Sequence, residues 1–391
     1  MILSINKDNM VGAIVIEGHV QGLSNVRSLG ELGVPVYVLD VVNCLARYSK
    51  FCKKFFICPS FESESLISFL LELAKRENLR GWLLMPSNDH VVENLSKHET
   101  ELSPFYKMLV PKKDALNSII DKGVLMEIAE SCGVSVPKTC YRVDMERARS
   151  FRFPLLIKGR HGLSFYKSIH AKVLLVKSFE ELCQVMDGLD EKVAKDVMIQ
   201  EMIPYDKERG ILSFTCFTSQ GDVRSYWMGK KVREHPIRFG TATMSQSVFV
   251  DSIIEKAAPL IKTLNYTGVC EVEFMYDSRD GVYKIIEINP RTWLWVGLAK
   301  ACGVDYAKMV YCYVNEIPFN YPSSYEIGTK WRNTLTDFFY GVGGVLKKEI
   351  LFKDYLRSLK GKIVHAVWNS QDVLPGLVFP VLLPLIAVRR R

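Results

Sequence analysis

The stretch that decides the fold is residues 271–291, which read EVEFMYDSRDGVYKIIEINPR. Two runs of alternating apolar and polar residues flank the turn DSRDG at 277–281. This pattern predicts two antiparallel strands joined as a hairpin. Because successive side chains of a strand point to opposite faces, the polar residues of both strands gather on one surface, and the Val, Phe and Ile residues between them face a core.

The polar face carries Glu271 and Glu273 on the first strand, and Glu287, Asn289 and Arg291 on the second. Mg²⁺ prefers hard oxygen ligands, and an arginine beside it can neutralise transferring phosphate. A solvated hairpin with charged outward residues is the alternative. The Asn-Pro-Arg ending and the apolar residues that follow it favour a buried metal site instead.

The hairpin resembles the metal-binding hairpin of the ATP-grasp superfamily, in which an acid on one strand and a Glu-x-Asn pair on the next hold two Mg²⁺ ions. The resemblance makes Glu273 the first acid and Glu287 and Asn289 the pair. It implies that Arg291 contacts phosphate or an acyl intermediate. The implied cofactors are ATP and Mg²⁺, with Mn²⁺ as the alternative metal.

Two lysine motifs of that superfamily occur upstream in the expected order. Asp121-Lys122 begins a helix that ends at GVSVP, residues 133–137, and PLLIKG at 154–159 resembles the strand whose lysine reaches the α- and β-phosphates. By resemblance, Lys122 and Lys158 contact the phosphates of ATP.

Two further motifs lie between the lysines and the hairpin. The segment QEMIP at 200–204 resembles the hinge that holds adenine and ribose, which makes nucleotide ligands of Gln200, Glu201, Met202 and Ile203. The segment GKKVR at 229–233 resembles the strand whose basic residues face phosphate or substrate, here Lys231 and Arg233. With Arg291, these two residues form the expected catalytic set.

One segment departs from the superfamily pattern. Its members carry a glycine- and serine-rich flexible loop over the phosphates after the second lysine. Residues 159–167 read GRHGLSFYK, with only two glycines. We expect that the segment can still act as a lid, with Arg160, His161 or Lys167 meeting phosphate.

The first 110 residues have a different texture. Residues 12–40 read as strand, glycine turn, helix and strand, which predicts a βαβ unit with a parallel sheet. The turn is GxxxG rather than GxGxxG, so the dinucleotide fingerprint is incomplete. Asp40 is more simply a strand-end cap than a ribose ligand. A helix at 62–78 and a strand at 81–85 follow, and the strand ends in Pro86-Ser87-Asn88-Asp89, which suits either ligand contact or helix capping.

From Pro111 onward the pattern becomes α+β with mainly antiparallel strands. The apolar patterning predicts helices at 114–132 and 251–264. It predicts strands at 154–158, 170–177, 197–203, 211–218, 223–229, 268–276 and 282–288.

The chain of 391 residues has a formal net charge of +8, and residues 328–391 hold most of it, with eleven Lys/Arg against four Asp/Glu. A nearly neutral body argues against nucleic-acid binding. We expect 329–371 to be helical. The apolar run 373–388 is short for a membrane span and contains three prolines that weaken a helix. We therefore expect peripheral membrane contact through 373–391, or a tail packed on the protein's own surface.

The ten cysteines form no CxxC pair, and no secretory signal is visible at the N-terminus. Both observations predict a cytoplasmic protein, with the inner face of the membrane as a further location.

The sequence thus predicts an α/β N-terminal domain followed by α+β ATP-grasp domains and a basic, apolar C-terminal tail. The expected units are a Rossmann-like domain at 1–110, a subdomain with the phosphate-binding lysines at 111–195, a subdomain with the metal hairpin at 196–325 and an extension at 326–391.

The resemblance extends, more loosely, to a branch of predicted carboxylate–amine ligases related to D-aspartate ligases. It implies ATP-dependent joining of a small carboxylate to an amine or thiol through an acyl phosphate, by an enzyme that can be a homodimer. An ATP-grasp carboxylase and a non-catalytic nucleotide-binding scaffold are the alternatives.

Overall fold

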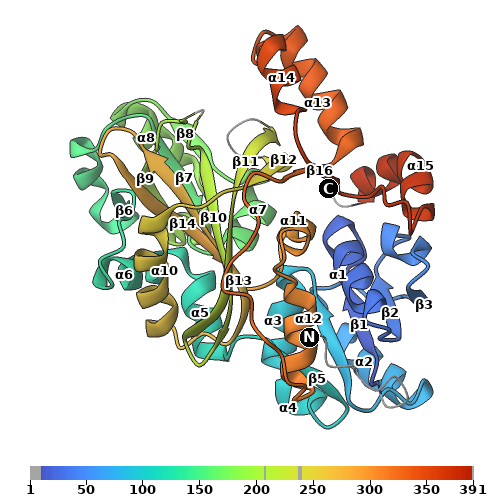
Figure 1. Ribbon diagram of the computed structural model, residues 1–391. Helices are drawn as coiled ribbons and strands as arrows, with labels where there is room; N and C mark the ends of the chain where they lie inside the picture. The colour runs from blue at the N-terminus through green and yellow to red at the C-terminus, as the bar shows by residue number, and fades with distance from the viewer. Residues whose placement is uncertain (1–9, 207, 237–239, 390–391) are drawn as a thin grey trace.

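The computed structural model describes residues 10–206, 208–236 and 240–389, which form three sheets with their helices (Figure 1). The first nine residues and Arg390–Arg391 lie outside the described residues. The expectation about a secretory signal at the N-terminus and the last two residues of the segment 373–391 therefore fall outside the structure.

The first sheet has five parallel strands in the order β3-β2-β1-β4-β5. Its strands are wholly or largely apolar because helices cover both faces of the sheet. The parallel sheet confirms the βαβ unit expected at the start of the chain. The strands are β1 Ala13–Ile16, β2 Val36–Asp40, β3 Cys52–Ile57, β4 Trp82–Pro86 and β5 Tyr106–Met108; the helices are α1 Val20–Glu31, α2 Ser65–Arg76, α3 Asp89–Lys97 and α4 Glu99–Leu102, with a 3₁₀ turn η2 at Leu45–Tyr48.

Asp40 closes the first turn of this sheet. Its buried Oδ2 accepts a hydrogen bond from the Gly18 backbone N–H at 2.8 Å. Asp40 therefore fixes the β1–α1 turn, as its interpretation as a strand-end cap predicts.

The second sheet has four antiparallel strands in the order β6-β9-β7-β8. The boundary proposed at 195/196 falls just before β9, which lies in the middle of this sheet. Its elements are β6 Thr139–Tyr141, β7 Leu155–Gly159, β8 Leu174–Val176 and β9 Val197–Glu201, with a 3₁₀ turn η3 at Arg142–Ser150 and helices α7 Gly162–Ile169, α8 Phe179–Gly188 and α9 Glu191–Lys195.

The segment 114–132 is helical as predicted except at Asp121, and the helix expected to begin at Asp121-Lys122 is confirmed. Asp121 leaves the helical conformation and separates α5, Lys113–Ile120, from α6, Lys122–Ser131. Its side chain accepts from the backbone N–H groups of Gly123 and Val124, so it caps the second helix.

The third sheet has seven strands in the order β14-β13-β10-β11-β12-β15-β16. The sequence patterns missed β12, which is rich in Thr and Ser, and the three-residue strands β15 and β16. The strands are β10 Ile211–Ser219, β11 Asp222–His235, β12 Thr241–Ser247, β13 Gly268–Asp277, β14 Val282–Asn289, β15 Lys330–Arg332 and β16 Ile363–His365; the helices are α10 Asp251–Thr263, α11 Val296–Ala301 and α12 Tyr306–Val314.

The extension after residue 326 is therefore not wholly helical, because two of its segments complete the third sheet. Its helices are α13 Thr334–Leu346, α14 Phe352–Ser358 and α15 Leu374–Arg389. The expected weakening of a helix by the three prolines of the tail is also wrong. Pro375 lies in the first turn of α15, where no backbone N–H is needed, and the helix continues through Pro380 and Pro384.

The tail packs on the first domain. The Asp372 carboxylate accepts from Arg27 Nε on α1 at 2.8 Å and from the hydroxyl of Ser49. Phe379 and Leu382 are buried in the same core as strands β1 and β2. Within the described residues, no helix is both long and apolar enough to cross a membrane.

Candidate active site

The metal hairpin forms as the alternation predicts. Strands β13 and β14 are antiparallel, with Glu271 opposite Asn289 and Glu273 opposite Glu287. The apolar residues between them, Val272 and Phe274 among them, are fully buried on the other face.

Glu271 lies deepest on this face and holds its neighbours. One of its oxygens accepts from Ser213 Oγ on β10 at 2.7 Å, and the other accepts from Asn289 Nδ2 at 3.0 Å. Burial raises the pKa of Glu271 to about 8, and the nearby negative charge of Glu273 adds to the shift. Glu271 is therefore a supporting residue that orients the amide of Asn289.

Each of the other two acids of the hairpin faces a lysine. Glu273 pairs with Lys231 of β11 at 3.1 Å, and Glu287 pairs with Lys122, the first residue of α6, at 2.7 Å. The positive charge of Lys122 lowers the pKa of Glu287 to about 2. Although burial opposes it, Glu273 and Glu271 hold the pKa of Lys231 above its usual range. The negative charge of each acid is therefore partly neutralised by a lysine from another element.

Lys158, near the end of β7, belongs to the same electrostatic cluster. Its side chain is buried, and burial lowers its pKa to about 7. The neighbouring positive charge of Lys122 lowers this pKa further, whereas Glu287 raises it. A buried lysine beside a second lysine is a ready partner for an anionic group such as phosphate.

The segment expected to form a lid contains the helix α7. Before it, Arg160 makes a bidentate ion pair with Asp121, at 3.0 and 2.7 Å, and the Arg160 carbonyl accepts from the Lys122 backbone N–H. Lys167, on α7, pairs with Glu62 of the first domain. The segment thus positions Lys122 and bridges two domains in this structure; phosphate contact by Arg160, His161 or Lys167 stays a prediction.

The proposed nucleotide hinge lies at the end of β9. Gln200 donates to Thr139 Oγ1 at 2.8 Å, and the backbone N–H groups of Glu201 and Met202 donate to the carbonyls of Lys138 and Pro154.

The Glu201 carboxylate is buried. It accepts from the Arg152 backbone N–H at 2.9 Å and lies 3.4 and 3.6 Å from the guanidinium groups of Arg152 and Arg279. Ile203 is also buried. These contacts fix the segment, and nucleotide contact by Gln200, Glu201, Met202 and Ile203 stays a prediction.

Arg291 follows β14 and reaches the first domain. Its guanidinium binds both oxygens of Asp89, at 2.6 and 2.7 Å. Asn88 caps α3 by accepting from the His90 backbone N–H. The capping interpretation of the turn after β4 is therefore confirmed, and its Asp89 contacts a residue of the candidate site; ligand contact by this turn stays a prediction.

Arg233, expected beside phosphate or substrate, lies elsewhere. Irregularities on both sides of it break the alternation of β11, so it does not share the orientation of Lys231. Its guanidinium instead makes a bidentate ion pair with the buried Asp337 of α13, at 2.7 and 2.8 Å. The structure corrects this prediction: Arg233 holds the C-terminal extension against the sheet.

The donor set fits a magnesium–nucleotide complex by its chemistry. Two carboxylates and an amide oxygen are hard ligands of the kind that Mg²⁺ takes together with water and phosphate oxygens. In the part of the chain that the structure describes, no group of three or more His, Cys, Asp or Glu residues is arranged to hold a metal ion.

Comparisons with known proteins agree with this geometry. Residues 228–312, which include the hairpin, match the family described as "Carbamoyl-phosphate synthase L chain, ATP binding domain". The chain is 25% identical over 334 residues to a D-aspartate ligase from Enterococcus faecium, covering 81% of this chain and 77% of that protein.

Two solved structures share the fold. One is the biotin carboxylase domain dimer of the Hydrogenobacter thermophilus 2-oxoglutarate carboxylase, in complex with MgADP, ADP and bicarbonate. Its TM-score is 0.62 at 14% identity, and the match covers 80% of this chain and 71% of that one. The other is an L-amino acid ligase from Bacillus licheniformis, with a TM-score of 0.55 at 14% identity and coverage of 78% and 74%.

The hairpin thus lies within a segment that matches an ATP-grasp domain, and the solved structures share the fold of the chain. Over most of its length, the chain is similar in sequence to a D-aspartate ligase.

Proposed function

We propose that this protein is an ATP-dependent ligase that joins a small carboxylate to an amine through an acyl phosphate and releases ADP and phosphate. The observation that carries the proposal is the pairing of Glu273 with Lys231 and of Glu287 with Lys122 on one hairpin face. Acids paired with lysines suit a site that binds both a divalent cation and a polyphosphate, because the acids attract the cation and the lysines attract the phosphates.

Each residue has a role in this proposal. Glu273, Glu287 and Asn289 would hold Mg²⁺, or Mn²⁺ as the alternative metal, while Glu271 orients Asn289. Lys122, Lys158 and Lys231 would neutralise phosphate oxygens. Bound Mg-ATP supplies the phosphoryl group that turns a carboxylate oxygen into a leaving group.

Arg291 would bind the carboxylate and the phosphate that later leaves. Its guanidinium lies at the junction of the hairpin and the first domain, where Asp89 fixes it. An amine positioned there attacks the activated acyl carbon, loses a proton, and forms the C–N bond as the C–O bond to phosphate breaks. The protein's main contributions are positioning and charge neutralisation, so no side-chain nucleophile is required.

The relatives support the ligase assignment by their names, a D-aspartate ligase and an L-amino acid ligase. The carboxylase among the solved structures keeps bicarbonate activation as a second candidate. The hairpin site is also compatible with a thiol acceptor in place of the amine, and with a nucleotide-binding scaffold that lacks turnover. The dimer in that carboxylase structure supports a homodimer, which light scattering of the purified protein would test.

The ten cysteines, all within the described residues, form no disulfide with one another and are mostly buried, which supports our proposal of a reducing, cytoplasmic location. Fractionation of the producing cells would test this location.

Hydroxamate formation tests the reaction. The purified protein would be incubated with Mg-ATP, hydroxylamine and pools of amino acids or other small carboxylates, with ADP and AMP both measured. Hydroxamate with equimolar ADP is the expected result, and it names the carboxylate before the amine is known. AMP in place of ADP would contradict the acyl-phosphate route, and ADP formation that depends on bicarbonate alone would favour the carboxylase.

A further inference from the structure

Helix α13 turns its polar and small residues inward. Its buried positions are Asp337, Gly341 and Gly344, spaced along one side of the helix. Asp337 accepts from Arg332 of β15 as well as from Arg233, and the glycines leave room for Tyr355 and Ile350. The ion pairs of Asp337, together with Leu335, which packs on the core shared with β1 and β2, therefore attach this helix to the body, and the glycines bring it close to the segment that contains α14.

The outward side of the same helix is apolar, and α14 continues it. Six large apolar side chains form what we call the extension surface, and each is between 46% and 78% exposed. They are Phe338, Phe339, Leu346, Leu351, Phe352 and Leu356. Figure 1 shows that α13 and α14 project together from the body of the molecule. Large apolar patches on a protein surface mark sites of contact with another apolar surface.

Cations border the extension surface. Lys347 and Lys348 follow α13, and Lys353 and Arg357 lie on α14; all four are exposed. Of the acids in this region, Asp337 is buried in its ion pairs and Asp354 pairs with Arg357. Glu349 is exposed beside Lys348, so four cations stand against two exposed acids. The border is therefore positively charged.

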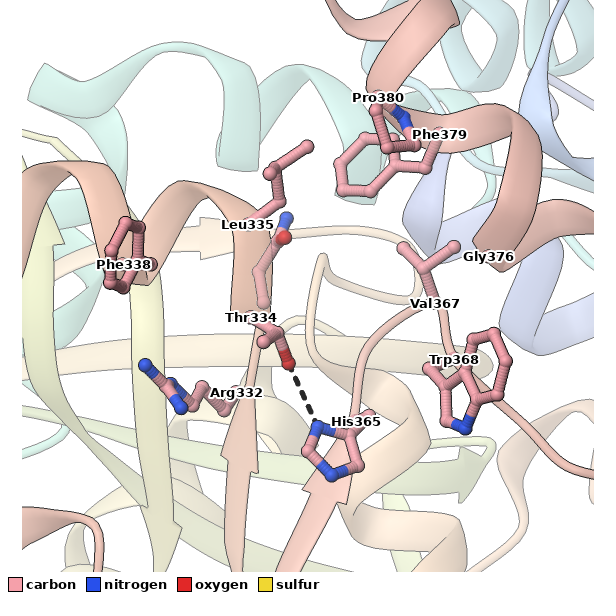
Figure 2. A pocket seen from close by; sticks show the side chains of 11 residues that line it. Arg332, Thr334, Leu335, Phe338, His365, Val367, Trp368, Gly376, Phe379 and Pro380 are labelled. Atoms are coloured by element: carbon pink, nitrogen blue, oxygen red, sulfur yellow. Dashed lines mark hydrogen bonds between the residues drawn. The ribbon is translucent and has the colours of Figure 1, made fainter.

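An apolar pocket of about 430 Å³ adjoins α13 (Figure 2). Leu335 and Phe338 line one side, while Trp368 and Phe379 line the side towards α15. At the polar end, His365 is hydrogen bonded to Thr334. The pocket continues the apolar character of the extension surface towards the tail helix.

We infer that the extension surface docks on a bilayer that contains anionic lipids. Its aromatic and aliphatic side chains enter the apolar edge of the headgroup layer, and its lysines and arginine meet lipid phosphates. The pocket between α13 and α15 gives room for one acyl chain. The bilayer is a better occupant than a second copy of the chain, because pairing two such surfaces would bring two positively charged borders together.

This placement differs from contact through 373–391 alone. Leu382 of the tail is buried against the protein and Phe379 faces only the pocket, whereas Leu377 and Val381 are exposed and can add to the contact made by α13 and α14. Docking through α13 and α14 would hold the ligase beside a membrane-bound acceptor, a role beyond the ligase chemistry itself.

Vesicle flotation of the full chain tests the inference. The protein would be floated with vesicles of phosphatidylcholine alone and of phosphatidylcholine mixed with phosphatidylglycerol, at low and high salt. We expect binding to the mixed vesicles that weakens with salt. Because burying a phenylalanine side chain is worth about tenfold or more in partitioning, the double variant Phe338→Ser/Phe339→Ser should lose at least that factor.

A matched variant, Phe249→Ser, removes a similarly exposed phenylalanine from the body of the molecule and should bind vesicles like the unchanged protein. Thermal melting and ATP-dependent hydroxamate formation report whether each variant is folded and active, independently of lipid. The inference is overturned if the unchanged protein stays with the soluble fraction, or if the double variant floats as well as Phe249→Ser. If the unchanged protein is a dimer in solution and does not float with vesicles, and if the double variant is a monomer, the extension surface binds a second copy of the chain instead.

Discussion

Arg291 and Asp89 form a bidentate ion pair at 2.6 and 2.7 Å although 202 positions separate them in the sequence. One residue follows the β13–β14 hairpin, and the other begins the helix after β4 of the first domain. The pair therefore joins the candidate nucleotide site to the first domain.

Asp89→Asn should weaken this link without unfolding the protein. Asparagine cannot accept two charge-assisted hydrogen bonds, so Arg291 loses its fixed orientation. We expect kcat/KM for the carboxylate to fall by about tenfold to a hundredfold, with nucleotide affinity nearly unchanged. Steady-state kinetics with both substrates varied would measure this. Asp187→Asn, an exposed acid on α8, is the control, and equal kinetics for the two variants would contradict the proposed role.

The two glutamates of β13 should respond differently to the same substitution. Glu271→Gln keeps the contacts with Ser213 and Asn289, and the pKa of about 8 means that Glu271 is largely neutral at pH 7. We expect its ADP formation to stay within about threefold of the unchanged protein. Glu273→Gln removes a proposed metal ligand and should lower the rate by about a hundredfold or more. Equal losses in the two variants would show that this division of roles is wrong.

Arg233→Gln should act mainly on stability. Asp337 keeps its bonds to Arg332 and Thr243 but loses a buried bidentate partner. A loss of about 2 kcal/mol in the free energy of unfolding is expected, with catalysis by the remaining folded protein preserved. Urea unfolding would measure it against Arg224→Gln, an exposed arginine on the same strand. A stable variant that has lost its activity would restore Arg233 to the catalytic set.

The hairpin should lose stability in acid through Asp277. Although burial opposes it, hydrogen bonds from Arg279 and Lys284 hold the pKa of this carboxyl well below its usual range. A depressed pKa stabilises the folded state above the unfolded pKa of about 4, and the contribution is lost as the pH falls towards the folded pKa.

Asp277→Asn should therefore be strongly destabilised at pH 7, by about 3 kcal/mol, and the difference from the unchanged protein should shrink below about pH 4. Urea unfolding at both pH values checks this. Asp222→Asn, an exposed acid on β11, should show no such pattern. A difference that stays constant with pH would exclude the ionised carboxyl as its cause.

Local patterns predicted the hairpin because strand alternation depends only on neighbours along the chain. Opposition of Glu273 and Glu287 follows directly from that alternation and a short turn. The helix start at Asp121-Lys122 was predicted from the motif there, and Asp121 does cap that helix, whereas the apolar pattern through 114–132 gave no sign that the preceding turns form a separate helix.

Long-range partners could not be predicted in this way. Nothing in the segment 229–233 shows that Arg233 will meet Asp337, about a hundred residues later, because the register irregularities of β11 and the position of α13 are not encoded in that segment's pattern. The short strands β15 and β16 carry too few residues for a periodic signal; β12 offers an edge to β15, and β15 offers one to β16.

Nucleotide titration tests the central claim most directly, that the β13–β14 hairpin holds a metal–nucleotide complex. Isothermal titration calorimetry would compare ADP binding, with and without Mg²⁺, to the unchanged protein, Glu287→Gln and the control Glu255→Gln on α10. The account predicts Mg²⁺-dependent binding that Glu287→Gln weakens by about tenfold to a hundredfold and Glu255→Gln leaves unchanged. Equal, Mg²⁺-independent binding by all three proteins, or no binding by the unchanged protein, would contradict it.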